Sequence, residues 1–181
     1  TLEEIKKELT TEKYDFLRNN ENLGNNIIML TLGGSYAYGT NNEDSDIDIR
    51  GCALNNKTQI LTNQNFDQVI DENTDTTIYS FNKLISLLTN VNPNTIELLG
   101  NKPEHYFYLS SIGQELISHA HMFLSQTAVH SFGGYANQQL YRLNQRAAHQ
   151  LSQSGLEEHI LKTLEFMKSD FNKKYSSFPD D

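Results

Sequence analysis

The chain has 181 residues, of which 37% are hydrophobic, and carries a formal net charge of −9 at pH 7. This length is enough to bury a hydrophobic core in one domain and a further part. The acidic balance argues against a generally basic surface for nucleic acid, although it leaves room for a local basic groove. No apolar run approaches the roughly 20 residues that cross a bilayer, and Cys52 is the only cysteine. We therefore expect a cytoplasmic protein with no membrane contact and no internal disulfide.

The first hundred residues carry both helix and strand patterns. Thr1 and Glu4 have capping-box spacing, and the apolar residues that follow predict a helix to about residue 19. Three short apolar runs predict strands, at residues 26–34, 46–54 and 74–81. Residues 82–90 continue as a predicted helix that ends before Pro93.

From about residue 102 the strand patterns end. Apolar residues at intervals of three and four predict a long helix and then a second one, and we assign both stripes to the core. The first stripe consists of Val129, Phe132, Ala136, Leu140, Leu143 and Ala147, and the second of Leu156, Ile160, Leu164, Met167 and Phe171. We expect an α+β fold, with a small mixed sheet flanked by helices in a domain of residues 1–101 and a helical region over residues 102–181.

The segment GGSYAYGTNNEDSDIDIRG, residues 33–51, joins a glycine-rich turn to alternating aspartates. On a strand, Asp46 and Asp48 would project from one face while Ile47 and Ile49 face the core. Two carboxylates about 5 Å apart repel by roughly 3 kcal/mol at an effective dielectric constant of 20. A bound cation or a raised pKa must relieve this repulsion, and an all-oxygen site suits Mg²⁺ or Mn²⁺. The pattern predicts a metal site next to a turn whose amides suit a phosphate.

Two other ion-binding motifs fail against this segment. A calcium loop that starts at Asp44 needs glycine at its sixth position and glutamate at its twelfth, where this chain has Ile49 and Asn55. A Walker-type phosphate loop needs a lysine that follows its last glycine, and none follows Gly39.

The same residues carry a resemblance to a known superfamily. Gly34-Ser35, then ten residues, then Asp46-Ile47-Asp48 resembles the G-S…D-x-D signature of the DNA polymerase β-like nucleotidyltransferases. The longer string GSYAYGT…DSDIDIRG, with NPNTIELLG downstream, is similar to the bacterial and phage nucleotidyltransferases associated with RNA ligases, the RlaP type. The similarity spans roughly residues 20–150.

The resemblance implies a role for each matching residue. Gly34 and Ser35 would hold the triphosphate, and Asp46 and Asp48 would ligate two Mg²⁺ (or Mn²⁺) ions. A third carboxylate on a later strand supports the activating metal in the superfamily. Its best match is Asp75, which aligns with a D-x-x-x-Y pattern through Tyr79, and Asp71 and Glu72 are nearby alternatives. Arg50 would pair with the carboxylates or bind a phosphate of the nucleotide.

These features predict transfer of a nucleoside monophosphate (NMP) from a nucleoside triphosphate (NTP), with ATP favoured, to an acceptor hydroxyl. The acceptor is an RNA end, a small molecule or a protein side chain, and the sequence does not choose between them. RNA repair is the role that the ligase-associated group suggests. One alternative is a nucleotide- or RNA-binding module without turnover, and another is a domain that modifies its partner in a toxin–antitoxin pair.

The last residues add two expectations. The chain stops in a loop-like YSSFPDD just after the second stripe, so we expect the helical region to be truncated at its C-terminus and the isolated chain to transfer little. The apolar stripe of the last helix, left without cover, is expected to promote self-association.

Overall fold

The structure is a computed structural model that describes residues 1–148, 155, 158, 160–162, 164–166 and 168–169. The chain divides into two compact units, the first spanning Thr1–Phe132 and the second beginning at Gly133. Among the described residues, no helix is both long enough and apolar enough to cross a membrane.

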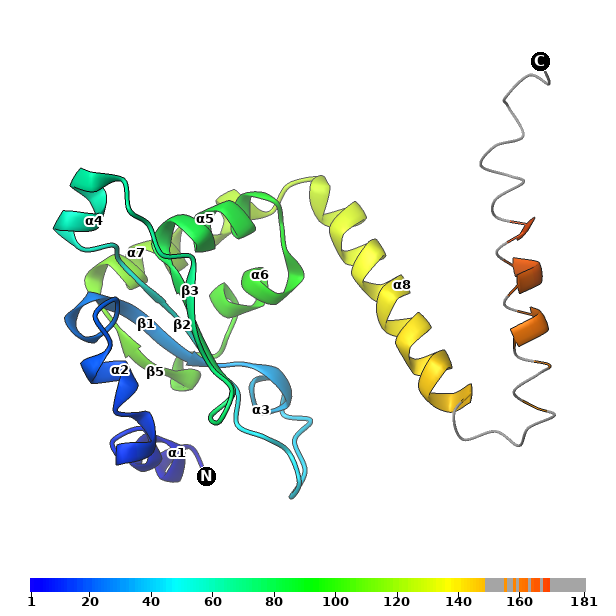
Figure 1. Cartoon of the computed structure of the whole chain (residues 1–181), viewed down its shortest axis with the longest axis horizontal. Helices are drawn as coiled ribbons and strands as arrows, with labels where there is room; N and C mark the ends of the chain where they lie inside the picture. The colour runs from blue at the N-terminus through cyan, green and yellow to red at the C-terminus, as the bar shows by residue number, and fades with distance from the viewer. Residues whose placement is uncertain (149–154, 156–157, 159, 163, 167, 170–181) are drawn as a thin grey trace, which may run out of the picture. The chain divides into compact units, whose positions relative to one another are not determined.

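One mixed sheet of five strands organises the first unit, which confirms the expected α+β class (Figure 1). The strands are β1 (Ile27–Leu32), β2 (Ile49–Ala53), β3 (Gln68–Asp71), β4 (Thr76–Ser80) and β5 (Tyr106–Leu109). They lie in the order β3-β4-β2-β1-β5. The β2–β4 pair is parallel and the other three pairs are antiparallel. This parallel pairing brings the start of β2 beside the start of β4, where the aspartates of both segments occur.

Short helices connect and cover the strands. The α-helices of the first unit are α1 (Leu2–Glu8), α2 (Phe16–Asn19), α3 (Gly34–Tyr38), α4 (Lys57–Thr62), α5 (Phe81–Thr89), α6 (Pro93–Leu99) and α7 (Ser111–Ser118). Single 3₁₀ turns are η1 (Glu12–Tyr14), η2 (Gly24–Asn26), η3 (Pro103–His105) and η4 (Ala120–Phe123). The last described helix, α8 (Thr127–Ala148), begins in the first unit and continues into the second.

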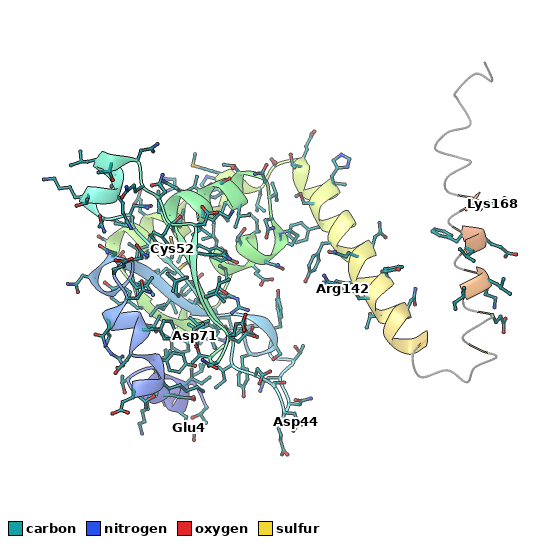
Figure 2. The ribbon with its side chains drawn as sticks, in the orientation of Figure 1. Glu4, Asp44, Cys52, Asp71, Arg142 and Lys168 are labelled. Carbon is teal, nitrogen blue, oxygen red and sulfur yellow. The ribbon has the colours of Figure 1, made fainter. Side chains whose placement is uncertain are left out.

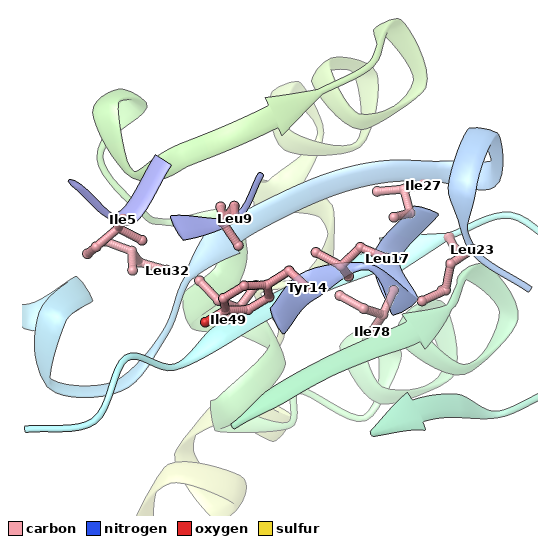
Figure 3. Close-up of a cluster of buried hydrophobic side chains, with 10 residues drawn as sticks. Ile5, Leu9, Tyr14, Leu17, Leu23, Ile27, Leu32, Ile49 and Ile78 are labelled. Carbon is pink, nitrogen blue, oxygen red and sulfur yellow. The ribbon is translucent and has the colours of Figure 1, made fainter. Parts of the chain in front are cut away.

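The N-terminal segment covers one face of the sheet. Ile5, Tyr14 and Leu17 are buried there against side chains from three strands, including Leu32 and Ile49 (Figure 3). Because side chains alternate along a strand, Ile49 faces this cluster while Cys52, three residues on, faces the opposite layer. The start of β2 is thus held in place by apolar packing just after Asp48.

Helices α5, α6 and α7 cover the other face. Their leucines pack on the β1–β2 pair, which buries Met29 and Cys52 completely. Burial raises the pKa of the Cys52 thiol to about 12, so this cysteine serves as a small apolar core residue.

The structure corrects several expected elements. The predicted helix over residues 1–19 keeps its Thr1/Glu4 capping box but breaks into α1, η1 and α2. The break falls at Thr10 and Thr11, whose hydroxyls donate to the carbonyls of Lys7 and Glu8 and compete with helix propagation. The strand expected over residues 46–54 starts only at Ile49, so Asp46 and Asp48 precede it.

The sequence predicted that strands end near residue 102, and this prediction is wrong. Tyr106–Leu109 forms β5 and pairs with β1, and β3 is a further strand that the sequence analysis missed. The chain after residue 101 therefore contributes to the sheet, although the division into domains at that residue stays a prediction.

The assignment of the first apolar stripe to the core is also wrong. Helix α8 forms as predicted, but its stripe is exposed: Val129 is 74%, Leu140 58% and Leu143 59% accessible. In the second stripe, the described members Ile160 and Leu164 are exposed as well. Leu156, Met167 and Phe171 lie outside the described residues.

Candidate active site

The glycine turn follows the last residue of β1 and leads into α3. Gly34 has φ of +54°, and a side-chain carbon there would collide with the carboxylate of Asp48. Gly33 is nearly as restricted, because an added carbon would come within 2.9 Å of the side chain of Arg50. Both glycines thus allow the polar side chains at the start of β2 to lie directly against the turn.

Asp48, Arg50 and Asp75 form one connected group beside this turn. Nη2 of Arg50 donates to Oδ1 of Asp48 at 2.7 Å and to Oδ1 of Asp75 at 3.1 Å. Its Nη1 donates to the backbone carbonyl of Asp75. A further backbone bond, from Ile49 N to the Asp75 carbonyl, fixes the start of β2 against the turn before β4. Two carboxylates that are distant in sequence are therefore brought together around one guanidinium group.

The surroundings of Asp48 shift its pKa upward. Burial, and then the adjacent Asp75 carboxyl, raise its pKa, while the Arg50 guanidinium acts in the opposite direction. Only 18% of the Asp48 side chain is exposed, compared with 53% of Asp75. Asp48 is therefore the more buried carboxyl of the pair, and its burial opposes the ionised form.

Among the described residues, Asp46 takes no part in the hydrogen bonds that join Asp48, Arg50 and Asp75. It is exposed and lines a cavity of about 380 Å³ together with Lys13, Glu72 and Asp75. The two isoleucines face the core as expected, since Ile49 is fully buried and Ile47 packs against the same cluster. Within the described part of the chain, however, no three His, Cys, Asp or Glu side chains are close enough to hold a metal ion together. Asp75 is the residue that connects the cavity to the Asp48–Arg50 pair.

The alternatives to Asp75 have other places in the structure. Asp71 accepts hydrogen bonds from the backbone N–H and the hydroxyl of Thr74, and so stabilises the turn between β3 and β4 (Figure 2). Glu72 is exposed on the cavity wall. Of the three carboxylates, Asp75 alone bonds to Arg50 in the described structure. Asp75 also has φ of +43°, a left-handed conformation at the last residue of the turn, directly before β4.

One interaction near the turn was missed by the sequence analysis. The hydroxyl of Tyr38, at the end of α3, donates to the carboxylate of Glu97 on α6. Burial raises the pKa of Glu97 to about 7. Glu97 lies in the segment NPNTIELLG, but nothing in that pattern indicates which residue its side chain meets, because α3 and α6 are distant in sequence.

The donor set of the pair suits a divalent cation. Mg²⁺ in proteins takes one or two carboxylates and completes its shell with water and substrate phosphates. Asp48 and Asp75 provide two such groups, and a cationic nitrogen already lies within hydrogen-bonding distance of both. The residues therefore fit a magnesium or manganese ion without a third ligand from the protein.

The mixed sheet thus has a glycine turn after β1 and aspartates directly before β2 and β4. Residues 2–164 match the model of the RNA repair pathway DNA polymerase beta family, RlaP, and the chain belongs to that family. No curated protein and no solved structure gives a significant match to the chain.

Proposed function

We propose that this chain is a metal-dependent nucleotidyltransferase that moves an NMP from an NTP, with ATP favoured, to an acceptor hydroxyl and releases pyrophosphate. The observation that carries the proposal is the close pairing of Asp48 and Asp75 beside the Gly34 turn. Membership of a polymerase β-like nucleotidyltransferase family supports the same class of activity.

Asp48 and Asp75 would hold Mg²⁺ or Mn²⁺, with Asp46 contributing from the same extended segment. Bound divalent cations would neutralise the phosphates and lower the pKa of the attacking hydroxyl. Gly34 and Ser35 would place backbone and hydroxyl donors at the triphosphate, since the turn is adjacent to the Asp48 carboxylate.

The transfer itself is an in-line displacement at the α-phosphorus. The acceptor oxygen forms a bond to this phosphorus, the bond to the bridging oxygen breaks, and pyrophosphate leaves with the electron pair. We assign the acceptor's proton to Asp75, because its side chain is the more exposed of the pair and lines the adjacent cavity.

The acceptor is expected to approach through the 380 Å³ cavity, which is large enough for one nucleotide or a small molecule. Among an RNA end, a small molecule and a protein side chain, the family description favours the RNA end.

The test is a transfer assay with each α-labelled NTP, Mg²⁺ or Mn²⁺, and RNA, protein or small-molecule acceptors. We expect label on an acceptor with the wild type and none with Asp48→Asn. Asp44→Asn is the matched control, because it removes the same charge from the exposed loop that precedes the site, and it should retain transfer (Figure 2). Equal transfer by wild type and Asp48→Asn would contradict the proposed function.

A further inference from the structure

The Arg50 side chain is fixed by more interactions than a surface arginine on a strand usually makes. Its two terminal nitrogens make four hydrogen bonds, to the carboxylates of Asp48 and Asp75 and to the carbonyls of Ile49 and Asp75. Its stem passes against Gly33, where an added side-chain carbon would come within 2.9 Å of its Cγ. The guanidinium is therefore built into the centre of the site, with 23% of the side chain exposed.

The position of one nitrogen is the important feature. Nη2 bonds Oδ1 of Asp48 and Oδ1 of Asp75 at once, so a single cationic group lies between the two carboxylates. A metal ion shared by both residues would need one oxygen from each carboxylate, and the two Oδ1 atoms already accept hydrogen bonds from Nη2. A divalent cation would also be repelled by a guanidinium only a few ångströms away. Arg50 in this arrangement therefore competes with a metal ion for the Oδ1 atoms of the pair.

We propose that Arg50 is an internal counter-ion that takes the place of the metal between Asp48 and Asp75 until the nucleotide binds. This inference rests on the proposed function, because it assigns the two carboxylates as metal ligands. When NTP and metal arrive together, Arg50 turns its freed donors to the triphosphate, for which its planar fork is well suited. The protein then binds metal weakly alone and tightly with nucleotide, which is a coupling between two ligands of one site.

A different role for Arg50 would predict the opposite change in metal affinity when the arginine is removed. If the arginine stays in place and holds the carboxylates ready for the metal, its removal weakens metal binding. If it occupies the metal's place, its removal strengthens metal binding, because the two carboxylates lose their counter-ion. The metal affinity of an Arg50 variant without nucleotide separates the two roles.

The experiment is a Mn²⁺ titration of the full chain, followed through the paramagnetic resonance signal of free Mn²⁺. We expect Arg50→Gln to bind Mn²⁺ about fivefold more tightly than the wild type without nucleotide. A non-hydrolysable ATP analogue should tighten Mn²⁺ binding strongly in the wild type and little in the variant. Arg142→Gln removes the same charge from an exposed position on α8 and should leave both affinities unchanged (Figure 2).

Unchanged or weaker Mn²⁺ binding by Arg50→Gln, with normal binding by the wild type, would overturn the inference and leave the proposed function standing. Absence of Mn²⁺ binding from the wild type, with and without the analogue, would overturn both. If Arg50→Gln does not fold, Arg50→Lys provides the test. Its ammonium keeps the positive charge but cannot keep all four hydrogen bonds, so Arg50→Met, which is uncharged and unbranched, is measured beside it. Tighter Mn²⁺ binding by Arg50→Met than by Arg50→Lys is expected, and equal or weaker binding by Arg50→Met contradicts the inference.

Discussion

At the scale of single residues, Gly34 is restricted in two ways. It combines a left-handed backbone with direct contact to the Asp48 carboxylate. Gly39, at the end of the same helix, shares the left-handed backbone with φ of +70° but has open space around it. Comparing alanine substitutions at the two positions therefore separates the cost of backbone strain from the cost of a steric collision.

We predict that Gly39→Ala lowers the free energy of unfolding by about 1 kcal/mol, the strain of the left-handed backbone alone. Gly34→Ala should lower it by about 3 kcal/mol, because the methyl group also displaces Asp48. Urea denaturation of both variants measures the difference. Equal losses would show that the Asp48 carboxylate does not lie against the turn.

Glu97 gives a prediction about pH. Its pKa is about 7 in the folded protein, above the usual 4.5. Between pH 4.5 and pH 7, the carboxyl is therefore protonated in the folded state and ionised in the unfolded state. Stability contributed by the neutral carboxyl is therefore full below pH 4.5 and is lost as pH rises through 7. Relative to the wild type, Glu97→Gln should gain about 2 kcal/mol at pH 8 and little at pH 4. Thermal melting at both pH values measures this, and an equal gain at both would contradict the pKa shift.

At the scale of elements, the central strand β1 could be predicted from the sequence, whereas the edge strands β3 and β5 could not. Ile27–Leu32 is an apolar run that both layers cover, so its pattern was plain. In β3, exposed Gln68 and Ile70 alternate with half-buried neighbours, and the pattern is as polar as a loop. Strand β5 has four residues, and its pairing with β1 depends on contacts that are far apart in the sequence.

The candidate site divides in the same way. Local sequence indicated Gly34, Asp46 and Asp48, because a turn and an alternating pattern are short-range features. The choice between Asp71 and Asp75 depended on the hairpin of β3 and β4, in which one carboxylate faces the turn and the other faces Arg50. The sequence had no signal for this orientation, since the two residues are four apart in one polar segment.

The hairpin predicts opposite effects for substitutions of its two aspartates. Asp71→Ala removes the acceptor for two bonds from Thr74 and should cost about 2 kcal/mol of stability while leaving Mn²⁺ affinity unchanged. Asp75→Asn keeps a residue that tolerates positive φ and should cost under about 1 kcal/mol. It should nevertheless weaken Mn²⁺ binding by about tenfold or more. Chemical denaturation and Mn²⁺ titration of both variants test the assignment, and exchanged effects would make Asp71 the ligand.

At the scale of the whole molecule, several apolar side chains of α8 are exposed in the described structure. Val129, Leu140 and Leu143 keep helical spacing, yet more than half of each is accessible. A contiguous apolar stripe on a helix is typical of a surface that binds another protein segment.

We predict that the chain self-associates through this stripe at high concentration. The double substitution Leu140→Gln and Leu143→Gln should lower the average mass measured by sedimentation at about 100 μM, because it removes two exposed apolar side chains from the stripe. Gln138→Ala, at an exposed polar position of the same helix, is the control and should not change the mass. A monomeric wild type under these conditions would contradict the prediction.

The measurement that tests the central claim most directly compares label in two positions of the same NTP. If the paired aspartates catalyse nucleotidyl transfer, α-labelled NTP marks the acceptor while γ-labelled NTP releases its label as pyrophosphate. Asp48→Asn and Asp75→Asn should each abolish the α-label transfer, and Asp44→Asn should retain it. Transfer of the γ-label to an acceptor, or α-label transfer that survives both substitutions, would contradict the account.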